Sequence, residues 1–195
     1  MNKYINALSI TLFTLALIFT GCKENNDPLA DLRNYEPGNI YFTAELNSLH
    51  FQIETRPVSE VDSIFSELLG RHDIPVTAEG LADGTFTGES PYDAYDYKHV
   101  VELTINNSKI ISVDYDEIHR SGKGKERDAG YNEEMGVTGM NPEQAYPHYE
   151  RSLGETQNMM DIDAISGASY SLYRFRYAVM VALMKAKLKK DAELE

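Results

Sequence analysis

Hydrophobic and polar residues alternate along residues 99–115 and predict two strands. The segment HVVELTI (99–105) ends at the polar run NNSK (106–109), and IISVDY (110–115) follows it. A period of two is typical of a strand with one buried face, and a short polar run between two such segments is typical of a hairpin. We therefore predict an antiparallel β-hairpin over residues 99–115. A shorter strand is expected at TFTGES (85–90), directly after a turn at Asp83 and Gly84.

The C-terminal part of the chain repeats its hydrophobic residues at helical spacing. From residue 170 to about residue 190 one apolar stripe is expected, made of Leu172, Phe175, Val179, Leu183 and Ala186. Lysines cluster near the end of this segment, where the helix dipole favours positive charge. Shorter helices are expected near 131–135 and 142–153. Together these elements predict an α+β fold for residues 80–190, a small antiparallel sheet with packed helices that include a long C-terminal helix.

Upstream of this domain, residues 39–79 read as an N-terminal extension of unknown role that packs against the main domain. Apolar residues at alternate positions in residues 40–55 predict a second hairpin. Residues 58–69 show helical spacing instead. We expect Ser59 and Asp62 to cap that helix and Gly70 to end it.

The first 21 residues have the pattern of a signal peptide. Lys3 precedes an uncharged apolar run that ends at Gly21 and Cys22. This ending resembles the lipobox of bacterial lipoproteins, in which the cysteine is diacylated and becomes the new N-terminus. An uncleaved transmembrane anchor is the alternative, because the run approaches the roughly 18–20 residues needed to span a bilayer.

Cys22 is the single cysteine of the chain, so it has no internal disulfide partner, and lipidation accounts for its presence. Residues 22–38 are then the lipidated N-terminus and a polar tether. The expected location is the cell envelope, with the protein lipid-anchored to a membrane on its extracytoplasmic side.

The net charge of the 195-residue chain is −13. Such a surface repels nucleic acid and anionic lipid headgroups, so a nucleic-acid partner is not expected. The acidic surface also keeps an exported protein soluble.

The segment DAISGASYS (163–171) places three serines and a glycine where the last helix is expected to begin. Free backbone N–H groups and the positive end of the helix dipole favour a phosphate at such a position. The alternative is ordinary capping, because serine and aspartate are common N-cap residues.

DAISGAS resembles the flavinylation motif of FMN-binding domains, which occur in subunits of the sodium-pumping NADH:quinone reductase, in Rnf complexes and in exported flavoproteins. The resemblance implies that the hydroxyl of Ser169 carries covalent FMN through a phosphoester bond. It also implies that Asp163, Ser166, Gly167 and Ala168 are recognition residues. A flavin transferase with FAD as donor, and a membrane electron donor, are the implied partners.

The resemblance extends over roughly residues 80–187. DGTFTGES and the following hairpin are similar to the opening of these domains, and NPEQAYPHYERSLGETQN (141–158) is similar to their lipid-anchored extracellular branch. GKGKERDAGYNEEM (122–135) also resembles a pattern of that branch. Its matching positions are Gly122, Lys125, Tyr131, Asn132 and Met135.

Other chemistries have weaker support in the sequence. DYDEIH (114–119) contains metal-ligand types, but strand alternation divides them between two faces. The five histidines fall singly, without ligand spacing, so surface or capping roles are expected. No Gly-x-Ser-x-Gly elbow surrounds the serines. The tyrosines of 92–97 are candidates either to stack on a flavin or to lie in an interface or core.

Three functions are therefore open. The first is a lipid-anchored electron carrier with covalent FMN, which shuttles electrons between a membrane donor and an extracytoplasmic acceptor. The second is a non-redox ligand-binding or adhesion lipoprotein. The third is a flavin-dependent reductase with its own substrate. No catalytic residue and no metal site is assigned in any of them.

Overall fold

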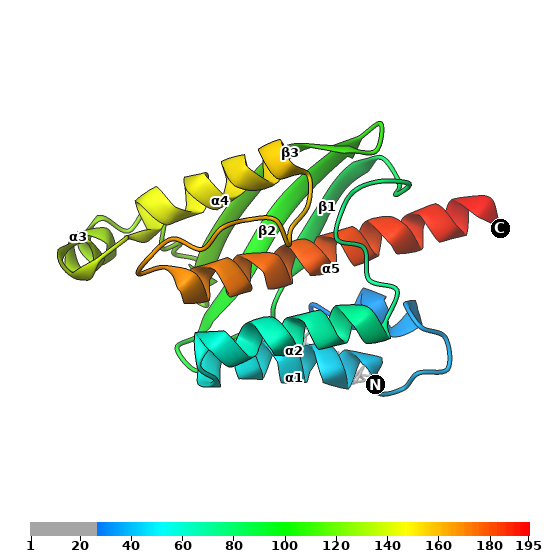
Figure 1. Cartoon of the computed structure of the whole chain (residues 1–195), viewed down its shortest axis with the longest axis horizontal. Coiled ribbons are helices and arrows are strands. Elements are labelled where there is room, and N and C mark those ends of the chain that lie inside the picture. The colour runs from blue at the N-terminus through cyan, green and yellow to red at the C-terminus, as the bar shows by residue number, and fades with distance from the viewer. Residues whose placement is uncertain (1–26) are drawn as a thin grey trace, which may run out of the picture.

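The computed structural model describes residues 27–195 and has the expected α+β architecture (Figure 1). One antiparallel sheet contains β1 (Gly84–Glu89), β2 (Tyr97–Asn106) and β3 (Lys109–His119), in that order. Helix α4 (Pro142–Thr156) packs against β3, and α5 (Ser169–Leu194) packs against β1 and β2. The expected signal peptide and Cys22 lie outside the described residues.

The β2–β3 hairpin confirms the predicted hairpin and extends it at both ends. Asn106 pairs with Lys109, and the two residues between them, Asn107 and Ser108, have φ values of 51° and 61°. Two consecutive residues with positive φ form the type I′ turn, which matches the twist of the two strands. Alternate residues of β2 are buried, as the period of two requires.

Helix α5 confirms the predicted C-terminal helix, but its burial is wider than one stripe. The residues of the predicted stripe are all buried, and from Phe175 to Met184 every side chain is buried. The sheet covers one side of this helix, and two further helices lie along another side (Figure 1). A helix that is apolar all round is typical of a core position.

The predicted hairpin in residues 40–55 is wrong, because this segment is helix α1 (Phe42–Thr55). Its buried side chains recur at a spacing of three and four: Phe42, Leu46, Leu49, His50 and Ile53. Two residues of the alternating pattern, Ile40 and Phe51, are 79% and 66% exposed. The helical period therefore determines which residues enter the core.

Helix α2 (Val58–Arg71) confirms the helix predicted over residues 58–69, but the expected ends are wrong. Pro57 stands at the N-cap position, and no side chain caps the helix. Gly70 lies inside the last turn, and His72 is the C-cap residue. Upstream, the expected tether contains a short 3-10 helix, η1 (Ala30–Asn34). Leu29, just before this helix, and Leu32 within it are fully buried.

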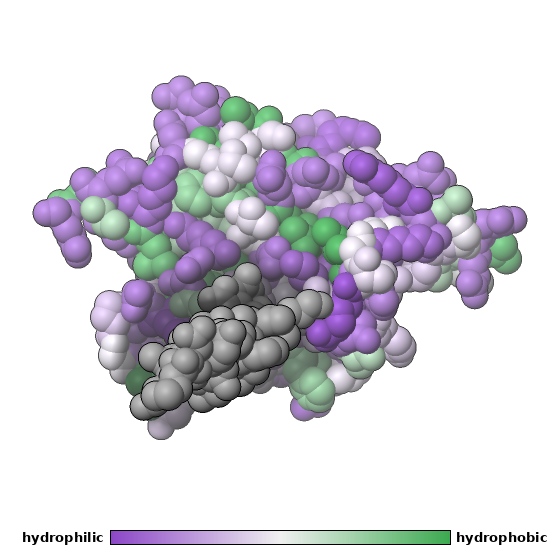
Figure 2. Space-filling model, turned by 180° about the vertical axis from the view of Figure 1, so that it is seen from behind, coloured by the Kyte–Doolittle hydropathy of each residue, from purple (hydrophilic) through white to green (hydrophobic). Residues whose placement is uncertain are grey.

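Helices α3 (Ala129–Thr138) and α4 are longer than the sequence predicts. Asp128 caps α3 and Asn141 caps α4, each by accepting a hydrogen bond from the backbone N–H of the third residue of the helix. Seen from behind, the surface is dominated by hydrophilic residues, with hydrophobic ones scattered between them (Figure 2). Within residues 27–195, none of the helices has the length and apolar character needed to cross a membrane.

Candidate functional site

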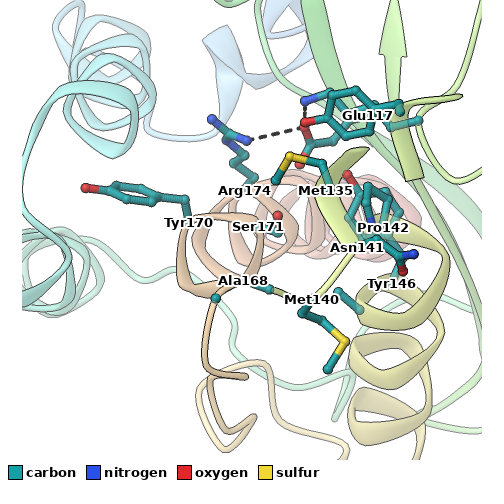
Figure 3. Close-up of a pocket in the computed structure, with 14 residues that line it drawn as sticks. Glu117, Met135, Met140, Asn141, Pro142, Tyr146, Ala168, Tyr170, Ser171 and Arg174 are labelled. Atoms are coloured by element: carbon teal, nitrogen blue, oxygen red, sulfur yellow. Dashed lines mark hydrogen bonds and ion pairs between the residues drawn. The ribbon is translucent and has the colours of Figure 1, made fainter. Parts of the chain in front are cut away.

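A cavity of about 200 Å3 lies between α3, the start of α4, the start of α5 and strand β3 (Figure 3). It joins segments that are far apart in the sequence. Its lining residues are Glu117, Lys125, Tyr131, Met135, Met140, Asn141, Pro142, Ala145, Tyr146, Gly167, Ala168, Tyr170, Ser171 and Arg174.

One wall of the cavity is the SGAS loop. Gly167 has a φ of +88°, and a Cβ atom there would lie 3.4 Å from the backbone nitrogen of Met140. The Tyr149 hydroxyl, on α4, donates a buried hydrogen bond of 2.9 Å to the Ala168 carbonyl. The left-handed conformation therefore favours glycine at this position.

The segment before the loop is fixed by Arg176 of α5, which is 5% exposed. Its guanidinium donates hydrogen bonds of 2.9–3.0 Å to the carbonyls of Met159, Met160 and Ile162. Buried carbonyls need such partners, and the planar guanidinium offers several donors at once. Arg176 thereby positions the chain that leads into DAISGAS.

Helix α5 begins at Ser169, and no side chain caps it. The alternative interpretation, in which a serine or aspartate of DAISGAS caps this helix, is therefore wrong. Helices α3 and α4, which also border the cavity, both have a capping side chain. The first N–H groups of α5 thus have no side-chain acceptor, and the hydroxyls of the motif are not used for capping.

Glu117 is fully buried at the inner end of the cavity. Its carboxylate accepts a hydrogen bond of 2.6 Å from Lys125 Nζ and lies 3.3 Å from Arg174 Nη1. Burial by itself raises the pKa of Glu117, but Arg174 and Lys125 outweigh burial and lower it to about 2. The carboxylate is therefore ionised at neutral pH. Tyr146 lies beside it, and burial and this negative charge raise the pKa of Tyr146.

Lys125 is also enclosed by aromatic rings. Its Nζ lies 4.2 Å from the ring centroid of Tyr97 and 5.3 Å from that of Tyr131. Ammonium groups at these distances are attracted to the ring faces. Within the tyrosine group of 92–97, Tyr97 therefore contacts the lysine of the cavity, whereas Tyr95 is 76% exposed.

The structure brings some of the expected site residues together and leaves others outside. Gly167, Ala168, Lys125, Tyr131 and Met135 all line the cavity. The remaining expected residues, Asp163, Ser166, Ser169, Gly122 and Asn132, do not line it.

The residues outside the cavity have other positions. Asp163 and Ser166 are exposed, and Ser169 is half-buried at the first position of α5. Gly122 adopts a positive φ in the turn after β3. Asn132 is buried, and its side-chain amide donates to the carbonyls of residues 125, 126 and 128. Asn132 thus shapes the loop that carries Lys125.

Sequence reasoning missed Glu117 and Arg174. Glu117 occurs in DYDEIH and is buried on one face of β3. The half-buried Asp116 and the exposed Asp114 lie on the opposite face, so the strand divides the segment between two faces as expected. Arg174 is a charged residue inside an otherwise apolar helix, and this was the available signal, because a charge in a core needs a partner. The sequence does not show which residue that partner is.

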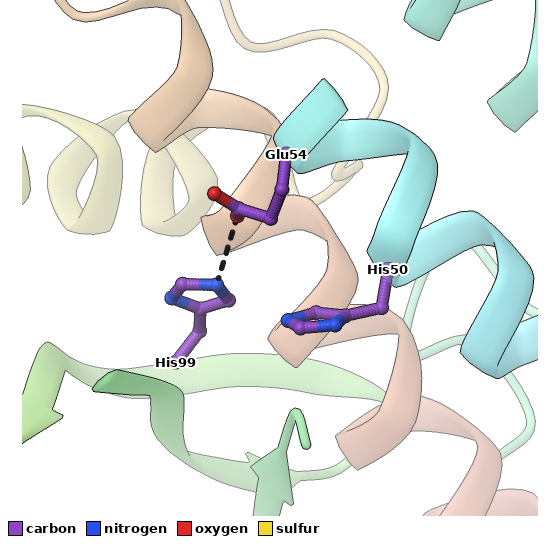
Figure 4. A group of neighbouring side chains, drawn as sticks. All are labelled: His50, Glu54 and His99. Atoms are coloured by element: carbon purple, nitrogen blue, oxygen red, sulfur yellow. Dashed lines mark ion pairs between the residues drawn. The ribbon is translucent and has the colours of Figure 1, made fainter. Parts of the chain in front are cut away.

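The expectation of surface or capping roles for the histidines is wrong for His50 and His99, which are both buried. Their ring centroids lie 5.4 Å apart between α1 and β2 (Figure 4). His72 is also paired, because its two ring nitrogens contact Glu36 and Glu45 at 2.5 and 2.6 Å.

The residues around the SGAS loop fit part of an FMN group. Tyr131 and three apolar side chains (Met135, Met140 and Ala145) offer a surface for a flat ring, and the uncapped start of α5 offers N–H groups for a phosphate. At about 200 Å3 the cavity is smaller than the roughly 300–1,000 Å3 typical of ligand pockets. A cavity of this size has room for only part of a flavin ring system.

Fold and site together define a class: an α+β protein with a small cavity where its long C-terminal helix begins. No protein-family model matches the chain. It is similar to the CPE2226 protein from Clostridium perfringens, a solved structure, with 34% identity and a TM-score of 0.53 over 56% of this chain and 92% of that chain. At this identity and coverage the chain belongs to the family of the clostridial protein, whose name states no function.

A curated relative is the 15 kDa lipoprotein of Treponema pallidum. The two sequences are 29% identical over 109 residues, which is 55% of this chain and 77% of that protein. A further solved structure, a protein from Clostridium thermocellum, is 27% identical over 57% of this chain, with a TM-score of 0.34.

Proposed function

We propose that this chain is a lipid-anchored extracytoplasmic flavoprotein that carries FMN covalently on Ser169 and passes electrons from a membrane donor to an extracytoplasmic acceptor. One observation carries the proposal. The two segments that resemble FMN-binding proteins, 122–135 and 163–169, are separated in the sequence but contribute Lys125, Tyr131, Met135, Gly167 and Ala168 to the same cavity.

The anchor in this proposal is a lipid on Cys22. It is supported by the apolar run that ends at Gly21-Cys22 and by the similarity to a protein named as a lipoprotein in Treponema pallidum. Attachment of the cofactor suits this location, because a flavin that dissociates outside the cytoplasm is lost.

The proposed attachment reaction uses FAD and an exported transferase. The Oγ atom of Ser169 attacks the phosphorus on the riboflavin side of the FAD pyrophosphate and forms a phosphoester bond. The pyrophosphate bond breaks, AMP leaves, and the hydroxyl proton is released. Ser169 can serve as the attacking group because its hydroxyl does not cap α5 and because its side chain, which is only half-buried, is partly open to the transferase.

The protein then has to hold the cofactor and adjust its surroundings. FMN supplies reversible electron uptake when it is bound. The N–H groups at the start of α5 and the helix dipole stabilise the phosphate charge. Tyr131 and Met135, on α3, would hold the ring, and Lys125, held by Glu117, would supply a positive charge in the same cavity.

The proposal is tested by intact-mass measurement after coexpression with an exported flavin transferase. The wild-type chain should gain the mass of FMN minus water and turn yellow. Ser169→Ala should abolish the adduct, and Ser169→Thr should retain it, because threonine offers the same nucleophilic oxygen. Ser171→Ala is the matched control, since Ser171 lines the cavity two residues away and should leave the adduct unchanged.

Two outcomes would overturn the attachment site. An adduct that persists in Ser169→Ala but disappears in Ser171→Ala would move it to the second hydroxyl. No adduct on the folded wild-type chain, with transferase and FAD present, would remove the cofactor from the proposal.

Electron transfer needs its own measurement. Membranes from the native host that contain the flavinylated chain should bleach its visible absorbance when a respiratory substrate is added. Membranes with Ser169→Ala should lack that signal. A flavinylated chain that stays oxidised under these conditions would contradict the carrier role.

A further inference from the structure

His50, Glu54 and His99 form a second cluster (Figure 4). Arg174, which lines the cavity, donates a hydrogen bond to Glu54 of this cluster. His50 and Glu54 are four residues apart on α1, so they point from the same face of that helix. His99 projects from the buried face of β2 toward them. One potential ligand atom from each residue lies within 4.8 Å of the other two.

The two imidazoles lack the hydrogen-bond partners that buried polar groups normally have. His99 is 0% and His50 is 6% exposed. Neither ring nitrogen of His99, nor Nε2 of His50, has a hydrogen-bond partner among the described residues. His99 Nε2 lies 3.4 Å from Glu54 Oε1, a contact whose geometry makes no hydrogen bond. Buried nitrogens without partners are costly, and their retention needs an explanation.

We propose that His50, Glu54 and His99 bind a divalent transition-metal ion of the zinc class. Two imidazole nitrogens and one carboxylate oxygen are a ligand set that zinc uses, with other positions filled by water or a further group. Ligands of a tetrahedral zinc ion lie about 3.3 Å apart at the usual bond lengths of about 2.0–2.1 Å. The three ligand atoms lie within 4.8 Å of one another, so small rotations of the side chains would bring them to this spacing.

Arg174 supplies the outer contact that ligating carboxylates commonly have. Its Nε donates to Glu54 Oε1 at 2.8 Å and its Nη2 donates to Oε2 at 2.6 Å. Each carboxylate oxygen has a second lone pair, which stays available for a metal ion. The positive charge of Arg174 opposes a cation, but Glu117 partly neutralises it from the other side.

The expected consequence is structural. The ion would join α1, in the N-terminal extension, to β2 in the sheet. Because its three ligands come from α1 and β2, the ion would act as a cross-link between these elements. The inference is independent of flavin attachment, because none of the three ligands lines the cavity at the SGAS loop.

The test is metal binding by the full chain, purified in detergent without a polyhistidine tag and stripped with a chelator. Zinc content per chain is measured after dialysis, and affinity is measured against a chelating indicator. The wild-type chain should bind one equivalent. His50→Gln and His99→Gln should each lose at least about a hundredfold in affinity, since even outer-shell changes cost about 10–100-fold. His119→Gln, on β3 beside the acidic residues of DYDEIH, should bind like wild type.

Folding of each variant is checked by circular dichroism. If a histidine variant fails to fold, Glu54→Gln and the visible spectrum of cobalt-substituted wild-type protein decide the question. The cobalt spectrum should report nitrogen and oxygen ligands in tetrahedral geometry. Zinc should also raise the melting temperature of wild type and not of Glu54→Gln. A folded wild-type chain that binds no zinc, or zinc binding that is lost in His119→Gln and kept in His50→Gln, would overturn the proposal.

Discussion

Glu117 is the carboxylate that pairs with two cations of the site, the buried Lys125 and the half-buried Arg174. Lys125 and Arg174 both contact its fully buried carboxylate. Removing one member of a buried ion pair typically costs about 3–5 kcal/mol, because the remaining charge stays buried without compensation. We therefore expect Glu117→Gln to lower the free energy of unfolding at pH 7 by about that amount. Urea denaturation followed by circular dichroism measures the difference.

The pH dependence of this loss follows from the pKa of Glu117. The fold lowers this pKa from the ordinary value of 4.5 to about 2, so the unfolded chain binds the proton more readily. The stabilisation by Glu117 is thus present above about pH 4.5 and is lost as the pH falls toward 2.

Wild type should accordingly lose more stability between pH 5 and pH 2.5 than Glu117→Gln does. Glu102→Gln on β2 is the control, since its side chain is exposed and its effect should stay within about 0.5 kcal/mol. Equal pH dependence of the unfolding free energy in wild type and Glu117→Gln would contradict the lowered pKa of Glu117.

The backbone of α5 lies directly against Gly88 of β1. A Cβ atom on Gly88 would lie 1.9 Å from the Ala178 carbonyl oxygen and 2.7 Å from the Ala182 nitrogen. Both are backbone atoms, so the helix itself would have to move. We expect Gly88→Ala to lower the free energy of unfolding by about 1–3 kcal/mol.

Gly154 offers the matched control for this substitution. It lies inside α4, and a Cβ atom there would have no neighbour within 4 Å. Gly154→Ala should therefore stabilise the protein by about 0.5–1 kcal/mol through helix propensity. Thermal unfolding of both variants makes the comparison. A Gly88→Ala variant as stable as wild type would mean that α5 does not pack as closely on β1 as the structure indicates.

Among the helices and strands, the sequence predicted correctly those whose hydrophobic pattern allows only one interpretation. The β2–β3 hairpin shows strict alternation and a polar turn, and both follow from local rules. The segment of α1 was ambiguous, because its apolar residues satisfy a period of two over short stretches and a helical period over the whole. The interpretation as strands also concealed the i, i+4 relation of His50 and Glu54, which is visible only on a helix.

The candidate site was predicted in part, for a physical reason. The SGAS loop and the segment 122–135 have recognisable residue types, so Gly167, Ala168, Lys125, Tyr131 and Met135 could be named from the sequence. Glu117 and Arg174 could not, because each becomes functional only through a partner that lies far away in the chain. Long-range pairing of this kind leaves no spacing that a single sequence reveals.

In the whole molecule, α5 joins the parts that matter for function. Its first turns line the cavity, Arg174 connects Glu117 with Glu54, and Tyr177 donates a hydrogen bond to the Leu46 carbonyl of α1. The N-terminal extension therefore packs on the same helix that begins with the proposed flavin attachment residue. A movement of α1 or α2 is therefore expected to shift α5 and thereby to change the shape of the cavity.

The position of the whole molecule in the cell depends, in our proposal, on Cys22. A single acyl chain holds a protein only marginally at a bilayer, whereas two chains give stable anchoring. Cys22→Ala should therefore leave the precursor unprocessed or release the chain from membranes. The measurement is detergent phase partitioning with intact mass, and Cys22 should carry the lipid mass in wild type. Ser169→Ala is the control, because it should partition like wild type. A Cys22→Ala chain that is still cleaved and still membrane-bound would show that something other than a lipid on this cysteine holds the protein at the membrane.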